Sequence, residues 1–63
     1  MCLSTVYRES KEPDRGRELL LKNAATVSVE NGRLVFTDIM GIRTVVDASL
    51  EKIDLMENFI IVK

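Results

Sequence analysis

The chain has 63 residues, of which 46% are apolar, and nine Lys and Arg against ten Asp and Glu give a formal net charge of −1. With one cysteine and no histidine, the chain can form neither an internal disulfide bond nor a zinc site built from Cys and His. A chain of this length buries only about 60% of its surface. We therefore expect a single domain over residues 1–63 that is stabilised as a homodimer.

The first third of the chain predicts two strands separated by a loop. Residues 3–7 are rich in β-forming side chains that alternate between two faces, with Val6 on one face and Tyr7 on the other. Residues 10–16 are mostly charged and contain a proline and a glycine, so we expect a mobile loop there. Residues 18–22 form a short apolar run whose length favours a strand over a helix.

The middle of the chain carries the clearest signal. Val27 and Val29 alternate with polar residues before Asn31–Gly32, and Leu34 and Phe36 belong to a second alternating run after it. An Asn-Gly pair between two such runs is typical of a hairpin closed by a type I′ turn, because both central residues of that turn need a positive φ. The sequence therefore predicts an antiparallel hairpin over residues 26–37.

The last third of the chain predicts three further strand segments. A reversal at Gly41 leads into a strand at residues 42–46. Residues 47–55 are ambiguous, because their apolar side chains fit both helical and alternating spacing. We predict a strand with a bend near Ser49 and keep a short helical turn as the alternative. Residues 59–62 are continuously apolar and predict a buried strand.

These segments together predict an all-β domain. If five or six short strands joined by tight turns formed a flat sheet, the sheet would have long unpaired edges and one apolar face exposed to solvent. We therefore expect a strongly bent meander or small barrel of the SH3-like or Sm-like class.

The compartment is also constrained by the sequence. The longest apolar stretches, residues 19–21 and 59–62, are far too short to cross a bilayer. The chain has no apolar segment of the secretory type, so we expect a cytoplasmic protein that does not associate with membranes. The thiol of such a protein stays reduced.

Catalytic chemistry has little support in this sequence. The usual acid and base groups are histidine or paired carboxylates, and here histidine is missing and the ten acidic residues are spread along the chain. The serines have no neighbouring base, and the three glycines lie at separate turns rather than in a phosphate-binding loop. We therefore expect that the protein is not an enzyme.

Nucleic-acid binding is the second hypothesis. It would use a face of the sheet and five arginines: Arg8, Arg15, Arg17, Arg33 and Arg43. The acidic net charge and the carboxylates interleaved with the arginines are more typical of a solvated surface than of a phosphate track. The three aromatic residues, Tyr7, Phe36 and Phe59, occur in strand patterns, where core packing is the simpler interpretation. A third hypothesis is a plain protein-interaction module.

Cys2 carries the leading hypothesis, although a small buried thiol is the simpler interpretation of a lone cysteine. Initiator Met1 is normally removed before a residue as small as cysteine, and Cys2 would then carry a free amino group. The amine nitrogen and the sulfur can close a five-membered ring on one metal ion, and the backbone nitrogen of Leu3 is a further donor. In a two-fold dimer the second Cys2 completes a planar S₂N₂ set. Such a set suits Ni(II) or Cu(II), whereas tetrahedral thiolate sites suit zinc.

The chain also resembles a known family. Residues 1–7 (MCLSTVY) match the M-C-x-(A/S)-x-V-(Y/F) opening of the CooT-like proteins, small nickel-binding proteins linked to maturation of carbon monoxide dehydrogenase. The likeness continues through residues 19–21, the Asn31–Gly32 hairpin, residues 39–41 and residues 50–62. It covers nearly the whole chain and is weakest in the charged loop.

The resemblance implies a function. It implies a small β-barrel homodimer that binds one Ni(II) per dimer at its interface through Cys2, and a metalloenzyme client. Members of the family also carry a description as predicted RNA-binding proteins, which the acidic net charge of this chain does not favour. The expected protein is therefore a nickel-binding accessory protein, with an Sm-like RNA-binding or protein-interaction module as the alternative.

Overall fold

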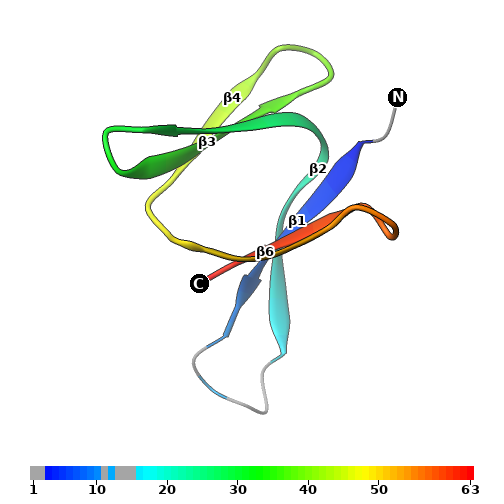
Figure 1. Cartoon of the computed structure of the whole chain (residues 1–63), viewed down its shortest axis with the longest axis vertical. Coiled ribbons are helices and arrows are strands. Elements are labelled where there is room, and N and C mark those ends of the chain that lie inside the picture. Colours follow the sequence, from blue (N-terminus) through cyan, green and yellow to red (C-terminus); the bar gives the residue numbers. More distant parts are fainter. Residues whose placement is uncertain (1–2, 11, 13–15) are drawn as a thin grey trace.

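The computed structural model of the chain describes residues 3–10, 12 and 16–63. These residues form one mixed sheet of six strands and no helix, which confirms the all-β prediction (Figure 1). The strands are β1 (Ser4–Glu9), β2 (Arg17–Glu30), β3 (Arg33–Asp38), β4 (Arg43–Val46), β5 (Leu50–Asp54) and β6 (Phe59–Val62). Within this part of the chain, nothing forms a helix that could cross a membrane.

The strand order is β4-β3-β2-β1-β6-β5, so the sheet is not a simple meander. Strands β1 to β4 follow one another as antiparallel neighbours, as expected. The β5–β6 hairpin, however, lies on the other side of β1, where β6 pairs with β1 in parallel. This arrangement covers the second edge of β1 and places Ile60 and Val62 in the same core as Val6. The meander prediction is therefore wrong for the last two strands.

Strand β2 is one long bent strand, where the sequence predicted two short ones. Its first half pairs with β1 and its second half with β3, and Ala24 has partners in both neighbours. Asn23 adopts a φ of 60° next to this point, and the register shifts on either side of it. A left-handed residue and a bulge bend a strand without ending it. The Lys22–Asn23 pair therefore marks a corner of the sheet and not the end of a strand.

The sheet curls strongly but does not close. Strands β4 and β5 are its two edges, and they do not contact each other, although residues 47–49 connect them directly. Figure 1 shows the strands of the sheet curled around one centre, and the side chains of the core cluster pack on the inner face of this curl. The prediction of a strongly bent sheet is confirmed, whereas closure into a barrel is not found.

The core lies on the concave face. Its buried side chains come from five of the six strands: Val6, Ala24, Leu34, Phe36, Val46, Ile60 and Val62. Phe36 is fully buried, as predicted for an aromatic residue in an alternating strand. Tyr7 and Phe59 differ, because their neighbours Val6 and Ile60 face the core and the two rings therefore lie on the opposite, outer face. Both rings are only half-buried.

The turns largely agree with the sequence. Asn31 and Gly32 have φ values of 53° and 75°, which confirms the hairpin turn with two positive φ angles. The region that was ambiguous between strand and helix is strand β5. The predicted charged loop falls partly outside the described residues; at its base, the backbone nitrogen of Ser10 donates to the carbonyl oxygen of Gly16 at 3.2 Å.

Candidate metal centre at the start of the first strand

The predicted metal ligand Cys2 lies outside the described residues, and Leu3 is the first residue that the structure describes. Leu3 is half-buried and leads directly into β1, whose start is held on both sides. On one side, Ser4 pairs with Ala24 of β2. On the other side, Thr5 pairs with Phe59 of β6, and its backbone nitrogen donates to the carbonyl oxygen of Asn58 at 3.1 Å. The start of β1, directly after Leu3, is therefore fixed in the sheet on both sides.

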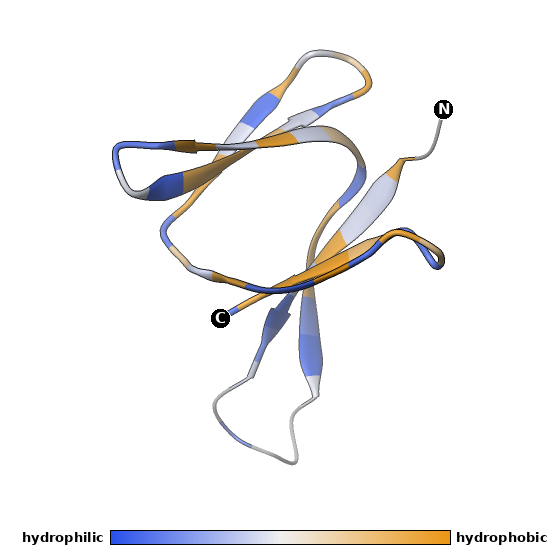
Figure 2. Ribbon diagram, viewed as in Figure 1, coloured by the Kyte–Doolittle hydropathy of each residue, from blue (hydrophilic) through white to orange (hydrophobic). Residues whose placement is uncertain are grey.

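Two exposed apolar turns lie at the same end of the molecule. We call them the apolar tips: Ile39, Met40 and Ile42 of the β3–β4 turn, and Leu55 and Met56 of the β5–β6 turn. Met40 is 80% exposed and Met56 is 88% exposed, far more than a large apolar side chain inside a fold. Figures 1 and 2 show both turns, coloured as apolar in the second view, on the same side as the N-terminal end of β1.

Backbone contacts tie both turns to the start of β1. The β5–β6 turn ends at Asn58, which accepts the hydrogen bond from Thr5. The β3–β4 turn begins at Ile39, whose backbone nitrogen donates to the carbonyl oxygen of Asn23 at 3.2 Å. Asn23 precedes Ala24, the partner of Ser4 in β2. The apolar tips therefore flank the place where the chain enters the sheet.

An aspartate directly before each tip, at the end of the preceding strand, shapes the turn. Oδ1 of Asp38 accepts hydrogen bonds from the backbone nitrogens of Met40 and Ile42, at 2.9 and 3.0 Å. Oδ1 of Asp54 accepts from the backbone nitrogens of Met56 and Glu57, at 3.0 and 2.8 Å. In a turn, backbone N–H groups have no neighbouring strand to bond. The carboxylate of an aspartate two residues earlier can accept their hydrogen bonds instead. These bonds use the backbone donors locally and leave the apolar side chains directed outward.

The sequence contained a signal for the apolar tips that the sequence analysis missed. Both turns have aspartate followed by two large apolar residues, in DIMG and DLME. Large apolar side chains inside a turn have no core to enter, because turns lie at the surface. An exposed pair of this kind at one end of a small domain is typical of an interaction surface.

The described residues contain no group of three or more Cys, Asp or Glu side chains that could hold a metal ion among themselves. Cys2, the metal ligand that the sequence predicts, lies outside these residues. A thiolate with nitrogen donors is chemically suited to Ni(II) or Cu(II) in planar geometry. Two donor pairs, each of one thiolate and one nitrogen, would be needed to fill such a plane.

The predicted arginines lie in two separate places. Arg8 and Arg17 line an open groove of about 980 Å³ at the base of the β1–β2 hairpin, together with the carboxylates of Glu9, Glu18, Asp47 and Glu51. Arg33 and Arg43 border a smaller groove beside the β2–β3 hairpin. Arg15 lies outside the described residues. The four described arginines therefore do not form one continuous basic track.

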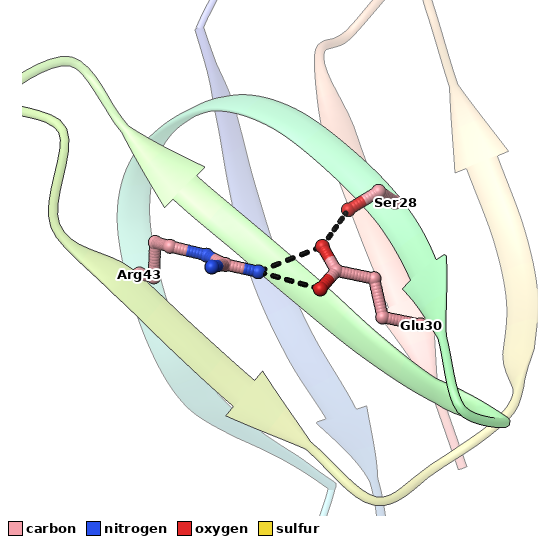
Figure 3. A network of polar contacts seen from close by, with 3 residues as sticks. All are labelled: Ser28, Glu30 and Arg43. Atoms are coloured by element: carbon pink, nitrogen blue, oxygen red, sulfur yellow. Dashed lines mark hydrogen bonds and ion pairs between the residues drawn. The ribbon is translucent and has the colours of Figure 1, made fainter.

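Two of these arginines have carboxylate partners. Nε of Arg17 contacts Oε2 of Glu9 at 3.0 Å. Nη2 of Arg43 contacts both carboxylate oxygens of Glu30 at 2.7 Å, and the hydroxyl of Ser28 donates to the same carboxylate at 3.1 Å (Figure 3). The hydrogen bonds from Arg43 and then from Ser28 hold the pKa of Glu30 below its usual value. These contacts stabilise the outer face of the β2–β3–β4 part of the sheet.

Comparison with known proteins decides the family. The family described as "CO dehydrogenase accessory protein CooT" matches residues 1–63, the whole chain. The chain belongs to the CooT family. A crystal structure described as a CooT from Carboxydothermus hydrogenoformans is similar in fold, with a TM-score of 0.81 over 97% of this chain and 94% of that one, at 19% sequence identity. A search of curated proteins finds no match.

Proposed function

We propose that this CooT family member is a Ni(II)-binding accessory protein in which Cys2 from two chains holds one metal ion at a homodimer interface. The observation that carries the proposal is the position of the start of β1 between the two apolar tips. An isologous interface over the apolar tips would bring the two N-terminal segments close to the two-fold axis. The two halves of the donor set would then meet on one metal ion.

The chemistry of the N-terminal segment supports this donor set. Cys2 is the only cysteine of the chain, and no histidine competes with it for a metal ion. Removal of Met1 would give Cys2 an amine nitrogen beside its sulfur, and metal binding would displace the protons of both groups. The backbone nitrogen of Leu3 is the further donor if the metal ion deprotonates it. Two thiolates with two nitrogens form a plane that Ni(II) favours over zinc.

The size of the domain supports dimerisation. A core supplied by one small open sheet leaves such a chain with limited stability, which a second copy can increase. A stable interface buries about 800 Å² on each partner. Leu55, Met40 and Met56, each at least 80% exposed, would form the centre of such an interface.

The role follows from the family and from this site. Membership of a family of carbon monoxide dehydrogenase accessory proteins supports a non-enzymatic part in the maturation of a metalloenzyme of that type. A metal ion held by a terminal segment can be passed to such a client without unfolding the sheet. We expect this transfer to take place in the cytoplasm, where the thiol stays reduced.

The direct test is native mass spectrometry of the untagged protein with increasing Ni(II). We expect a dimer whose chains lack Met1 and which binds one Ni(II), and we expect Cys2→Ser to lose this binding. Ser49→Ala is the matched control, because Ser49 is exposed in the β4–β5 connection and should leave the stoichiometry unchanged. Equal Ni(II) binding by wild type and Cys2→Ser would overturn the proposal, and so would full binding by a chain that retains Met1. A protein that binds no Ni(II) but captures a client would instead be a plain interaction module.

A further inference from the structure

The curled sheet has two edge strands, and they differ in how well they are protected from pairing with another chain. Edge β5 has a register shift between Leu50 and Lys52, and three of its five residues are charged. Bulges and charges of this kind block the addition of a further strand. Edge β4 pairs with β3 in unbroken register, and its last three residues are Thr-Val-Val. Strand β4 is therefore the edge that can accept another strand.

The backbone of β4 offers hydrogen bonds on its free side. The backbone nitrogen of Asp38 donates to the carbonyl oxygen of Ile42 at 3.0 Å, so these two residues are a hydrogen-bonded pair. In an antiparallel ladder, such pairs alternate with pairs that are not bonded. Thr44 is therefore a residue that bonds to β3, whereas Arg43 and Val45 direct their backbone N–H and C=O groups away from β3. Within the described part of the chain, no strand lies on that side of β4.

A small groove lies beside this edge on the outer face of the sheet. Val35 is 3% exposed and Val45 is 57% exposed, and the two valines pair with each other. Both face outward, because the neighbours of Val35 in β3 point into the core. The groove has a volume of about 260 Å³ and is lined by Glu30, Asn31, Arg33, Val35, Arg43 and Val45. It is smaller than a typical ligand pocket and suits one side chain of a strand beside β4.

The charges around the groove favour an acidic occupant. Two arginines line it against one carboxylate. Arg43 binds that carboxylate, Glu30, through Nη2 (Figure 3). Arg33 is exposed and has no hydrogen-bond or ion-pair partner among the side chains that the structure describes. Asp47 follows β4 but lines the separate groove at the base of the β1–β2 hairpin. An acidic side chain near Arg33 would therefore gain a charge partner without displacing Glu30.

We propose that β4 binds an extended acidic segment of a partner protein, which adds to the sheet as a further strand antiparallel to β4. In such an addition, backbone hydrogen bonds supply the affinity, and side chains that alternate along the strand supply the specificity. The segment places a valine or isoleucine over the groove beside Val45 and an acidic residue two positions away on the same face. The site uses neither Cys2 nor the apolar tips, so it does not depend on the proposed metal centre.

The test uses a short peptide as the probe. The N-acetylated, C-amidated peptide Thr-Glu-Val-Val-Thr-Glu has its second valine and both glutamates on one face when extended. It would be titrated into metal-free Cys2→Ser protein, which separates the result from the nickel proposal. Amide hydrogen exchange followed by NMR is the readout. We expect the amides of Arg43 and Val45 to become protected as peptide is added, and the amide of Thr44, which already bonds to β3, to change much less.

Two N-methylated forms of this peptide test the backbone pairing. Opposite Val45, the second valine would donate its N–H to β4, so its N-methylation should weaken binding about tenfold. The first valine directs its N–H away from β4, and its N-methylation is the matched control. Equal affinity of the two methylated peptides would overturn the proposal, as would unchanged exchange at Arg43 and Val45 with millimolar peptide. Protection that rises with protein concentration in the absence of peptide would show a second copy at this edge, and would also overturn it.

Charge variants test the specificity for an acidic segment. Arg33→Gln should weaken binding about threefold and reduce its dependence on salt, as for the loss of one exposed ion pair. Lys22→Gln removes the same charge from an exposed position of β2 and should bind as the parent does. A peptide with both glutamates replaced by lysine should bind more weakly than the acidic one. Equal affinities for the acidic and basic peptides, or equal losses in Arg33→Gln and Lys22→Gln, would contradict an acidic partner.

Discussion

The backbone nitrogen of Thr5 donates a hydrogen bond of 3.1 Å to the carbonyl oxygen of Asn58, joining the start of β1 to the β5–β6 turn. This bond continues the parallel β1–β6 pairing to the end of the sheet at which the N-terminal segment emerges. It also sets the distance between the start of β1 and the exposed Met56. One backbone contact therefore connects the start of β1 with the β5–β6 turn, which carries the exposed Leu55 and Met56.

The apolar tips give the first prediction. Replacing Met40 and Met56 together by Gln adds polar groups that the proposed interface would have to bury. We therefore expect the dissociation constant of the dimer to rise about tenfold or more. Analytical ultracentrifugation over a concentration series would measure this change. Val45→Gln is the control, because Val45 is 57% exposed on β4, away from the two turns. Dimers of equal strength in the double variant and the control would place the interface elsewhere.

Phe36 should be the most sensitive position of the core. It is fully buried at the centre of the concave face, and truncation of a buried phenylalanine to alanine costs about 3–5 kcal/mol. Because a domain of this size has little stability in reserve, we expect Phe36→Ala to be largely unfolded at 25 °C. Urea denaturation followed by circular dichroism would measure the effect, with Val45→Ala as the exposed control. A cooperative transition of Phe36→Ala close to that of the wild type would contradict this view of the core.

The β2–β3 turn gives a prediction based on backbone strain alone. Gly32 has a φ of 75°, and a Cβ atom added there would meet nothing within 4 Å. Gly32→Ala should therefore lose about 1–2 kcal/mol of stability from its left-handed backbone and nothing from a clash. Asn31→Gly keeps the turn conformation and should change stability by a few tenths of a kcal/mol. Thermal denaturation of both variants would measure these values, and equal melting temperatures would show that the turn is not strained.

The Glu30 carboxylate gives a pH-dependent prediction. Its pKa is lowered in the folded protein, chiefly by the hydrogen bond from Arg43, so its contribution to stability is present above the unfolded pKa. That contribution is lost as the pH falls through the lowered, folded pKa. The stability difference between wild type and Glu30→Gln should therefore shrink on acidification. Denaturation at several acidic pH values would measure this difference.

The same carboxylate can be followed directly by NMR. Arg43→Gln removes the first cause of the shift, and we expect the Glu30 carboxyl carbon to titrate at a higher pH in this variant. Ser28→Ala removes the second cause and should give a smaller change in the same direction. A titration of Glu30 that is unchanged in Arg43→Gln would show that the ion pair of Figure 3 does not persist in solution.

The sequence by itself determined the class of the fold and its local geometry. Alternating apolar residues on either side of Asn31–Gly32 specified a hairpin, because strand side chains alternate between faces and this turn needs positive φ angles. The same alternation placed Val6 and Tyr7 on opposite faces and buried Phe36. The lone Cys2 and the resemblance to the CooT family also pointed to the N-terminal segment as the candidate site.

Only the tertiary structure decided which strands lie beside one another. The parallel pairing of β1 with β6 joins residues far apart in the sequence, and no local pattern encodes such a contact. It placed Tyr7 and Phe59 together on the outer face, where core packing had been expected, and it brought Asn58 to Thr5. The bend of β2 at Asn23 was also decided by tertiary structure. The residues around Asn23 could either end a strand or continue it, and the pairing of the two halves of β2 with β1 and with β3 continues it. Local propensities set the elements, and long-range burial of their apolar faces set the arrangement.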